Sequence, residues 1–291
     1  MVTPWTIFAA ILTLLPLFLF AFFGEVASGR AAGLSLWARL AYPGILCLPY
    51  LLVSAPLGSF DWRWFALYTL IPIAIAALLW QARLIDSEQR GNWRDFLVLG
   101  VLGLAVDLRW FEPAWPPHMA VFNKMLLLDA GIYGFLAVRR LGGVGFDLRL
   151  RLRDARIGLR ELGIYTPIAV ALGLGLGFLH FHPILPRLTY AGGALVFTFF
   201  FIAVPEELFF RGSVQNMLER RLGRYPALFT TAVLFGLSHF NKRAQHFNWR
   251  YVLLAAIAGI FYGRAWRQDR RVGASAITHA CVDTLWSLWL R

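Results

Sequence analysis

The chain has 291 residues, of which 59% are hydrophobic and only 15% are charged. A soluble globular protein is about half apolar and about a quarter charged, so this composition excludes an ordinary soluble enzyme and indicates a membrane protein. The formal net charge of +12 does not indicate a nucleic-acid partner, because the arginines stand between apolar blocks and no soluble basic domain is left to bind nucleic acid.

Long apolar blocks predict an all-α fold, a polytopic bundle of roughly eight to ten transmembrane helices. The blocks are continuous rather than alternating, which argues against a β-barrel. The first block has no basic residues before it and is long for a signal peptide, so we expect a retained first span. The expected spans are about 5–23, 40–58, 64–80, 95–106, 119–138, 162–180, 189–210, 226–240, 251–266 and 272–290.

A basic segment separates the early spans from the later ones. Residues 139–160 (RRLGGVGFDLRLRLRDARIGLR) hold seven arginines, which places this segment on the cytoplasmic side. We therefore expect an N-terminal transmembrane region of unknown role (1–138), a basic cytoplasmic connector (139–161) and a C-terminal region (162–291) that carries the chemistry. Within the connector, 143–160 is either an amphipathic surface helix beside anionic lipid or a plain connecting segment.

The first candidate group is VPEELFFRG, residues 204–212. A charged side chain inside a membrane span costs at least a few kcal/mol, so such residues are functional candidates. Glu207 and Arg211 are four apart and are expected to form an internal ion pair. Glu206 points about 100° away from Glu207 on a helix. It is thereby left without a cation and suits a general base. The structural alternative is a solvated helix end.

Two further groups contain histidine. His239 closes the apolar run FGLSHF, and His279 and Asp283 are four apart in THACVD. A histidine and a carboxylate at this spacing can orient an imidazole or offer two ligands to one metal. The structural alternative is a hydrogen-bond network between helices.

Glutamate and two histidines from separate helices can activate water or bind zinc. The metal candidates are Glu206, His239 and His279, and zinc is the cofactor that they could bind, although the spacing is not that of an H-E-x-x-H zincin. The motifs leave open whether the chemistry needs a metal.

Taken in order, these motifs resemble a known series. The segments Glu206-Glu207-x-x-x-Arg211, Phe235-x-x-x-His239 and His279-x-x-x-Asp283 are similar to those of the CAAX proteases and bacteriocin-processing enzymes. That family includes the Ras-converting CAAX endopeptidase of eukaryotes and many prokaryotic Abi proteins. The resemblance covers about 160–291 and implies an all-helical intramembrane protease.

The resemblance also implies roles. Glu206 would be the base that activates water, assisted by His239. His279 and the residue at 283 would stabilise the oxyanion or position a ligand, and Glu207 and Arg211 would shape the site.

Asp283 departs from the family pattern. The family usually has asparagine at this position, and an ionised aspartate cannot donate a hydrogen bond to an oxyanion. A negative charge here instead suits orienting His279 or holding a cation.

We therefore expect an intramembrane endopeptidase that hydrolyses a peptide bond in a membrane-associated substrate, such as a lipidated protein or a C-terminal tail. The expected partners are membrane lipids and that substrate, and the expected location is the inner (cytoplasmic) membrane of a bacterium. Two alternatives stay open: a non-catalytic membrane immunity or scaffold protein of the same fold and, less favoured, a transporter.

Overall fold

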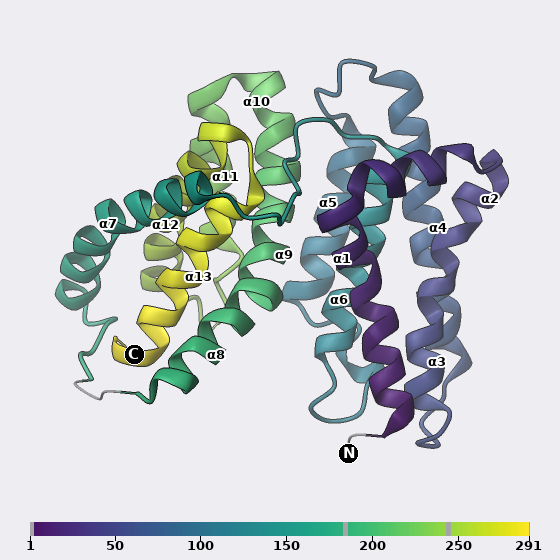
Figure 1. The fold of residues 1–291 in the computed structure, drawn as a ribbon, viewed down its shortest axis with the longest axis horizontal. Coiled ribbons are helices and arrows are strands. Elements are labelled where there is room, and N and C mark those ends of the chain that lie inside the picture. The colour runs from purple at the N-terminus through teal and green to yellow at the C-terminus, as the bar shows by residue number, and fades with distance from the viewer. Residues whose placement is uncertain (1–2, 183–185, 243–245, 291) are drawn as a thin grey trace. The chain divides into compact units, whose positions relative to one another are not determined.

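The computed structural model describes residues 3–182, 186–242 and 246–290. Within these residues the chain is helical and contains no strand, so the all-α prediction is confirmed. The chain folds into two compact units, Met1–Gly142 and Gly143–Arg291 (Figure 1).

The first unit is built from apolar helices with irregular turns between them. Its described elements are α1 (Pro4–Gly33), α2 (Leu36–Ala41), η1 (Tyr42–Cys47), α3 (Leu48–Ser54), α4 (Trp62–Ile85), α5 (Trp93–Asp107), η2 (Glu112–Ala114), α6 (Val121–Ile132) and η3 (Tyr133–Val138). The first helix starts at a capping box, in which the Thr3 hydroxyl accepts from the backbone N–H of Thr6 at 3.1 Å. Proline at position 4 suits the first turn, where its missing N–H costs nothing.

A buried arginine closes this unit at the end of η3. Arg139 is 1% exposed and binds Asp95 at 2.9 Å and Asp86 at 2.6 Å. Both carboxylates come from the region where α4 ends and α5 begins. A buried charge is tolerated only with such partners, so this cluster fixes the chain just before the second unit.

The second unit holds all the motifs that carry the candidate chemistry. Its described elements are α7 (Leu152–Gly175), α8 (Leu188–Thr198), η4 (Phe199–Ala203), α9 (Val204–Glu207), η5 (Leu208–Gln215), α10 (Asn216–Leu222), α11 (Arg224–Leu237), α12 (Trp249–Asp269) and α13 (Val272–Trp289). Helix α12 packs against α11, and α13 packs against both α7 and α12. The first of these contacts requires glycine, because a Cβ at Gly236 would lie 2.5 Å from the carbonyl oxygen of Val252.

The predicted connector over 139–161 is shared between the two units in this structure. Residues 143–151 are irregular, and α7 begins at Leu152, so 152–160 form the first turns of one continuous helix. The irregular stretch lies against the start of α13, where the N–H of Val272 donates to the carbonyl of Gly145 at 2.9 Å. Gly145 has φ +74°, and a Cβ there would collide with the carbonyl of Arg270.

Six stretches of the described chain are long and apolar enough to cross a membrane. They are Pro4–Gly33, Leu36–Ser54, Trp62–Ile85, Val121–Val138, Leu152–Gly175 and Leu188–Leu222. The expected count of eight to ten is not confirmed. Helices α5 and α11 have 15 and 14 residues, short of the roughly 20 that a bilayer requires. Helices α12 and α13 are longer but less apolar: α12 has arginines near both of its ends, and α13 carries His279 and Asp283 of the candidate site.

Candidate active site

Glu206 and Glu207 lie in an irregular part of the long helix 188–222. The four α-helical residues Val204–Glu207 stand between two π-helical stretches, Phe199–Ala203 and Leu208–Gln215. Pro205 has no N–H to continue the α-helical ladder, which accounts for a change in winding here. Such π-helical turns occur often at functional sites, and the sequence motifs give no sign of them.

The predicted ion pair between Glu207 and Arg211 is present. Nη1 of Arg211 lies 3.0 Å from Oε1 of Glu207, and both side chains are fully buried. The guanidinium also donates through Nη2 to the carbonyl of Gly259 at 3.0 Å and lies 4.5 Å from the ring centroid of Phe235. Helix 188–222 is thereby tied to α11 and α12.

His279 is the residue on which the carboxylates converge. Its Nδ1 donates to Oε1 of Glu207 at 2.8 Å. Its Nε2 lies 3.8 Å from Oε2 of Glu206 and 3.5 Å from Oδ2 of Asp283. The i, i+4 contact expected between His279 and Asp283 is therefore present.

The structure adds to the sequence interpretation at His279. The carboxylate at Nδ1 of the imidazole is Glu207, whereas Asp283 lies beside the opposite nitrogen, Nε2. Glu207 pairs with Arg211 as expected, and the same oxygen also accepts from His279. The physical reason is the place of α13, which brings Nδ1 of His279 within reach of an oxygen that already faces Arg211.

Aromatic rings hold the imidazole on its other sides. The ring of Tyr262 stacks on His279 with centroids 4.6 Å apart and an interplanar angle of 14°, and Phe235 meets it edge-on at 5.5 Å. Tyr262 is 1% exposed. Sequence reasoning missed it, because a tyrosine in an apolar helix reads as an ordinary core residue and no spacing rule singles it out.

His239 is held at the C-terminal end of α11. It is mostly buried, and its Nδ1 lies 2.8 Å from the carbonyl oxygen of Phe235 and 3.2 Å from the hydroxyl of Ser238. The ring of Tyr251 packs against it at 4.8 Å. His239 is close enough to Glu206 for the two to interact electrostatically.

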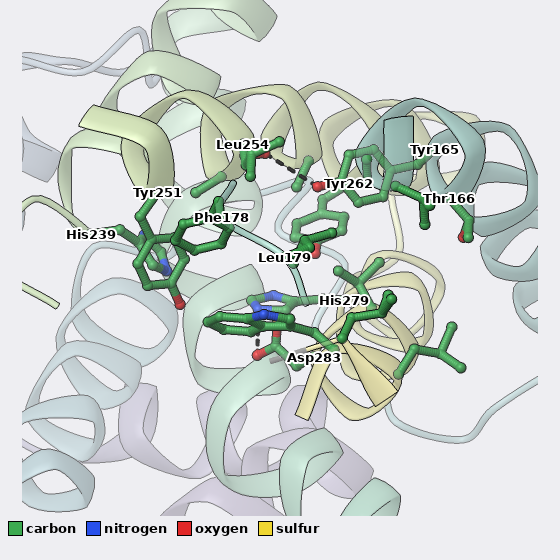
Figure 2. Close-up of a pocket in the computed structure, with 18 of the residues that line it drawn as sticks. Tyr165, Thr166, Phe178, Leu179, His239, Tyr251, Leu254, Tyr262, His279 and Asp283 are labelled. Carbon is green, nitrogen blue, oxygen red and sulfur yellow. Dashed lines mark hydrogen bonds and ion pairs between the residues drawn. The ribbon is translucent and has the colours of Figure 1, made fainter. Parts of the chain in front are cut away.

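His239, His279 and Asp283 line a common pocket of about 80 Å³ (Figure 2). Its walls come from α7 and the segment after it, α11, α12 and α13. Six aromatic side chains contribute to it: Tyr165, Phe178, Phe235, Tyr251, Tyr262 and Trp286. Glu206 and Glu207 are not among the lining residues, so they reach this pocket only through His279.

The candidate metal ligands do not form a recognisable ion site in the part of the chain that the structure describes. Among those residues, no group of three His, Cys, Asp or Glu side chains is arranged to hold a metal ion. Nδ1 of His279 is committed to Glu207, and Nδ1 of His239 lies at the carbonyl of Phe235. Zinc stays a prediction, and no step below is assigned to it.

Comparison with known protein families agrees with this geometry. Residues 188–285 match the family described as Type II CAAX prenyl endopeptidase Rce1-like. This part of the chain is similar to that family. No curated protein and no solved structure matches the chain.

The Rce1-like segment contains every candidate residue, from Glu206 to Asp283. The matched range begins at α8 and is shorter than the range of about 160–291 over which the motifs suggested a resemblance. The first unit and α7 lie outside it. The family consists of CAAX endopeptidases, which supports a protease function in the membrane. Together with six apolar helices, the match identifies an integral membrane protein.

Proposed function

We propose that the second unit is an intramembrane endopeptidase that hydrolyses a peptide bond in a membrane-associated substrate with water activated by Glu206 and His239. One observation carries this proposal. Oε2 of Glu206 and Nε2 of His279 face each other at 3.8 Å, and Oε2 is buried without a hydrogen-bond partner among the described residues. An oriented carboxylate with an unused acceptor is what a general base requires.

The 3.8 Å separation suits a small reacting group between the two atoms. It is too long for a direct hydrogen bond, but an oxygen about 2.8 Å from each atom fits in the angle between them. Glu206 would take a proton from water there while the hydroxide attacks the substrate carbonyl carbon. It would then return that proton to the leaving nitrogen, so that the products are a carboxylic acid and an amine.

The oxyanion of the tetrahedral intermediate needs a hydrogen-bond donor. Since Nδ1 of His279 donates to Glu207, its Nε2 donates on the substrate side when the ring carries both protons. His239 suits the activation of water instead, because its Nδ1 donates to the carbonyl of Phe235 and its Nε2 therefore carries the lone pair of the neutral ring, which can accept from the attacking water. Asp283 does not fit this role while it is ionised.

The substrate side of the proposal rests on the surroundings of the site. The pocket beside His279 is lined mainly by apolar and aromatic residues, and the helix that carries Glu206 is long and apolar enough to span a bilayer. These features favour a lipidated protein or a hydrophobic C-terminal tail that reaches the site from the membrane. Membrane lipids are then necessary partners, and we propose the inner membrane of a bacterium as the location.

The test compares Glu206→Gln and Glu206→Ala with the wild-type protein in isolated membranes and after purification into nanodiscs. Mass spectrometry of C-termini in membrane and lipidated peptides would detect new ends that depend on Glu206. We expect a loss of about 10²–10⁴-fold in rate for both variants, the range of general base catalysis. Glu25→Gln, an exposed carboxylate of α1 in the first unit, is the matched control. Wild-type rates in both Glu206 variants would end the proposal.

A further inference from the structure

Asp283 is not needed to orient the imidazole ring of His279. The imidazole is already fixed by Glu207 on Nδ1, by the stacked ring of Tyr262 and by the edge of Phe235. Asp283 instead lies beside Nε2 at 3.5 Å, where a carboxylate competes with the reacting group for the same nitrogen. A second carboxylate at this nitrogen calls for another explanation.

The side chain of Asp283 opens into the pocket (Figure 2). It is 30% exposed, whereas that of His279 is 2% exposed. Among the described residues that line the pocket, Asp283 is the carboxylate, and none is lysine or arginine. Of the nearby cations, Arg211 is enclosed by Glu207 and Gly259, and Lys242 interacts with Glu206. His279, when it carries both protons, is shared among Glu207, Glu206 and Asp283.

The remaining walls suit an organic cation with an aliphatic stem. Three aromatic rings pack against one another with centroids 5.2–5.8 Å apart: Phe178 from the segment after α7, Tyr251 from α12 and Trp286 from α13. Aromatic faces attract ammonium and guanidinium groups, and apolar walls accept the methylene chain that carries them. A carboxylate in such a pocket is costly unless a cation approaches it.

We propose that this pocket binds a lysine or arginine side chain of the substrate, with Asp283 as the counter-ion. The inference rests on the proposed function, because it assigns a specificity-determining residue to that same site. It gives the enzyme a preference for a basic residue next to the hydrolysed bond.

The first experiment measures binding without catalysis. Nα-acetyl-lysine amide and Nα-acetyl-norleucine amide differ in the ammonium group and serve as probes for the protein in nanodiscs, with saturation-transfer NMR as the readout. We expect the lysine probe to bind at least tenfold more tightly than the norleucine probe. Asp283→Asn should reduce this ratio to about one. Asp269→Asn removes the same charge outside the pocket, where Asp269 pairs with Arg153, and should keep the wild-type ratio.

The outcomes separate the inference from the proposed function. Equal binding of both probes to the wild type, or an unchanged ratio in Asp283→Asn, would overturn the inference. Lysine-selective binding without any peptide cleavage would retain the basic-side-chain site and reject the protease.

The second experiment uses a peptide library with randomised positions around a fixed membrane anchor. Cleavage products of the wild type should be enriched in lysine or arginine at one position, and Asp283→Asn should lose that enrichment. The readout is the ratio of products with a basic residue to products without one. A loss of overall activity in Asp283→Asn lowers both equally and does not change this ratio. Wild-type cleavage with no basic preference would leave the protease standing and overturn the inference.

Discussion

Nδ1 of His279 donates to Oε1 of Glu207 at 2.8 Å, and the same oxygen accepts from Arg211 at 3.0 Å. One buried carboxylate oxygen therefore joins a helix that carries a candidate base to the helix that carries a candidate oxyanion donor. This contact fixes which imidazole nitrogen faces the substrate. It also gives the arginine of the motif a definite task, since Arg211 holds the Glu207 carboxylate in place.

Glu207→Gln should lower kcat by at least about tenfold while the protein still folds, by analogy with carboxylates that orient a catalytic histidine. The amide is nearly isosteric, but it carries no charge and can present N–H instead of oxygen to Nδ1. The ¹⁵N NMR signals of His279 should shift with the loss. Glu25→Gln again serves as the matched control. A Glu207→Gln protein with wild-type kcat and unchanged His279 signals would show that this contact does not orient the site.

Arg211→Met should act mainly on stability. Removing one partner of a buried ion pair costs about 3–5 kcal/mol, because the other charge is left uncompensated. Both side chains here are fully buried, so the full penalty applies. Thermal unfolding in detergent micelles measures it.

The contrast with Glu206→Gln is the informative part of that measurement. Glu206 has an oxygen without a hydrogen-bond partner, so its replacement should change stability by less than about 1 kcal/mol while activity is lost. If Glu206→Gln unfolded the protein as strongly as Arg211→Met, the non-catalytic network expected as an alternative would be favoured.

Tyr262 is predicted to be a positioning residue. Its stacked ring prevents rotation of the imidazole, which a hydrogen bond at Nδ1 alone does not. Tyr262→Leu should reduce kcat more than KM, and Tyr262→Phe, which keeps the ring, should retain about two to ten times the activity of the leucine variant. Aromatic contacts of this kind contribute about 0.5–1.5 kcal/mol. Equal kcat values for the two variants would rule out the stack as the cause.

The sequence could identify the residues whose ionisable side chains are unusual within an apolar helix. Glu206, Glu207, His239, His279 and Asp283 stand out for that reason, and the Glu207–Arg211 pair follows from helical spacing alone. The partner of Nδ1 could not be predicted in this way. It depends on how α13 lies against helix 188–222, and a contact across 72 positions leaves no periodic trace.

Tyr262 and the π-helical turns escaped prediction for a different reason. An aromatic residue in a membrane helix costs nothing to bury, so its position gives no signal. The span count of eight to ten is not confirmed at α12 and α13, because their charged and polar residues lower the hydropathy by which a span is recognised.

The last prediction concerns acid sensitivity of the second unit. Arg271 binds Asp147 at 3.0 Å and Asp154 at 2.8 Å, which ties the irregular stretch 143–151 to the start of α13. Partial burial alone would raise the pKa of Asp147, but hydrogen bonds from Arg149 and Arg271 outweigh it, and the pKa lies below its ordinary value. A carboxyl whose pKa is depressed by folding stabilises the protein above its unfolded pKa, about 3.9. That contribution is lost as the pH falls through the lower pKa of the folded state.

Asp147→Asn should therefore be less stable than the wild type at pH 7, and the difference should shrink steadily below about pH 4. Urea unfolding in detergent micelles across this range measures it. Asp61→Asn, at the N-cap of α4 in the first unit, removes the same charge away from Arg271 and checks that the effect belongs to this cluster. A difference between wild type and Asp147→Asn that stayed constant from pH 7 down to about pH 2 would mean that the carboxylate charge contributes nothing and that only the shape of the side chain matters.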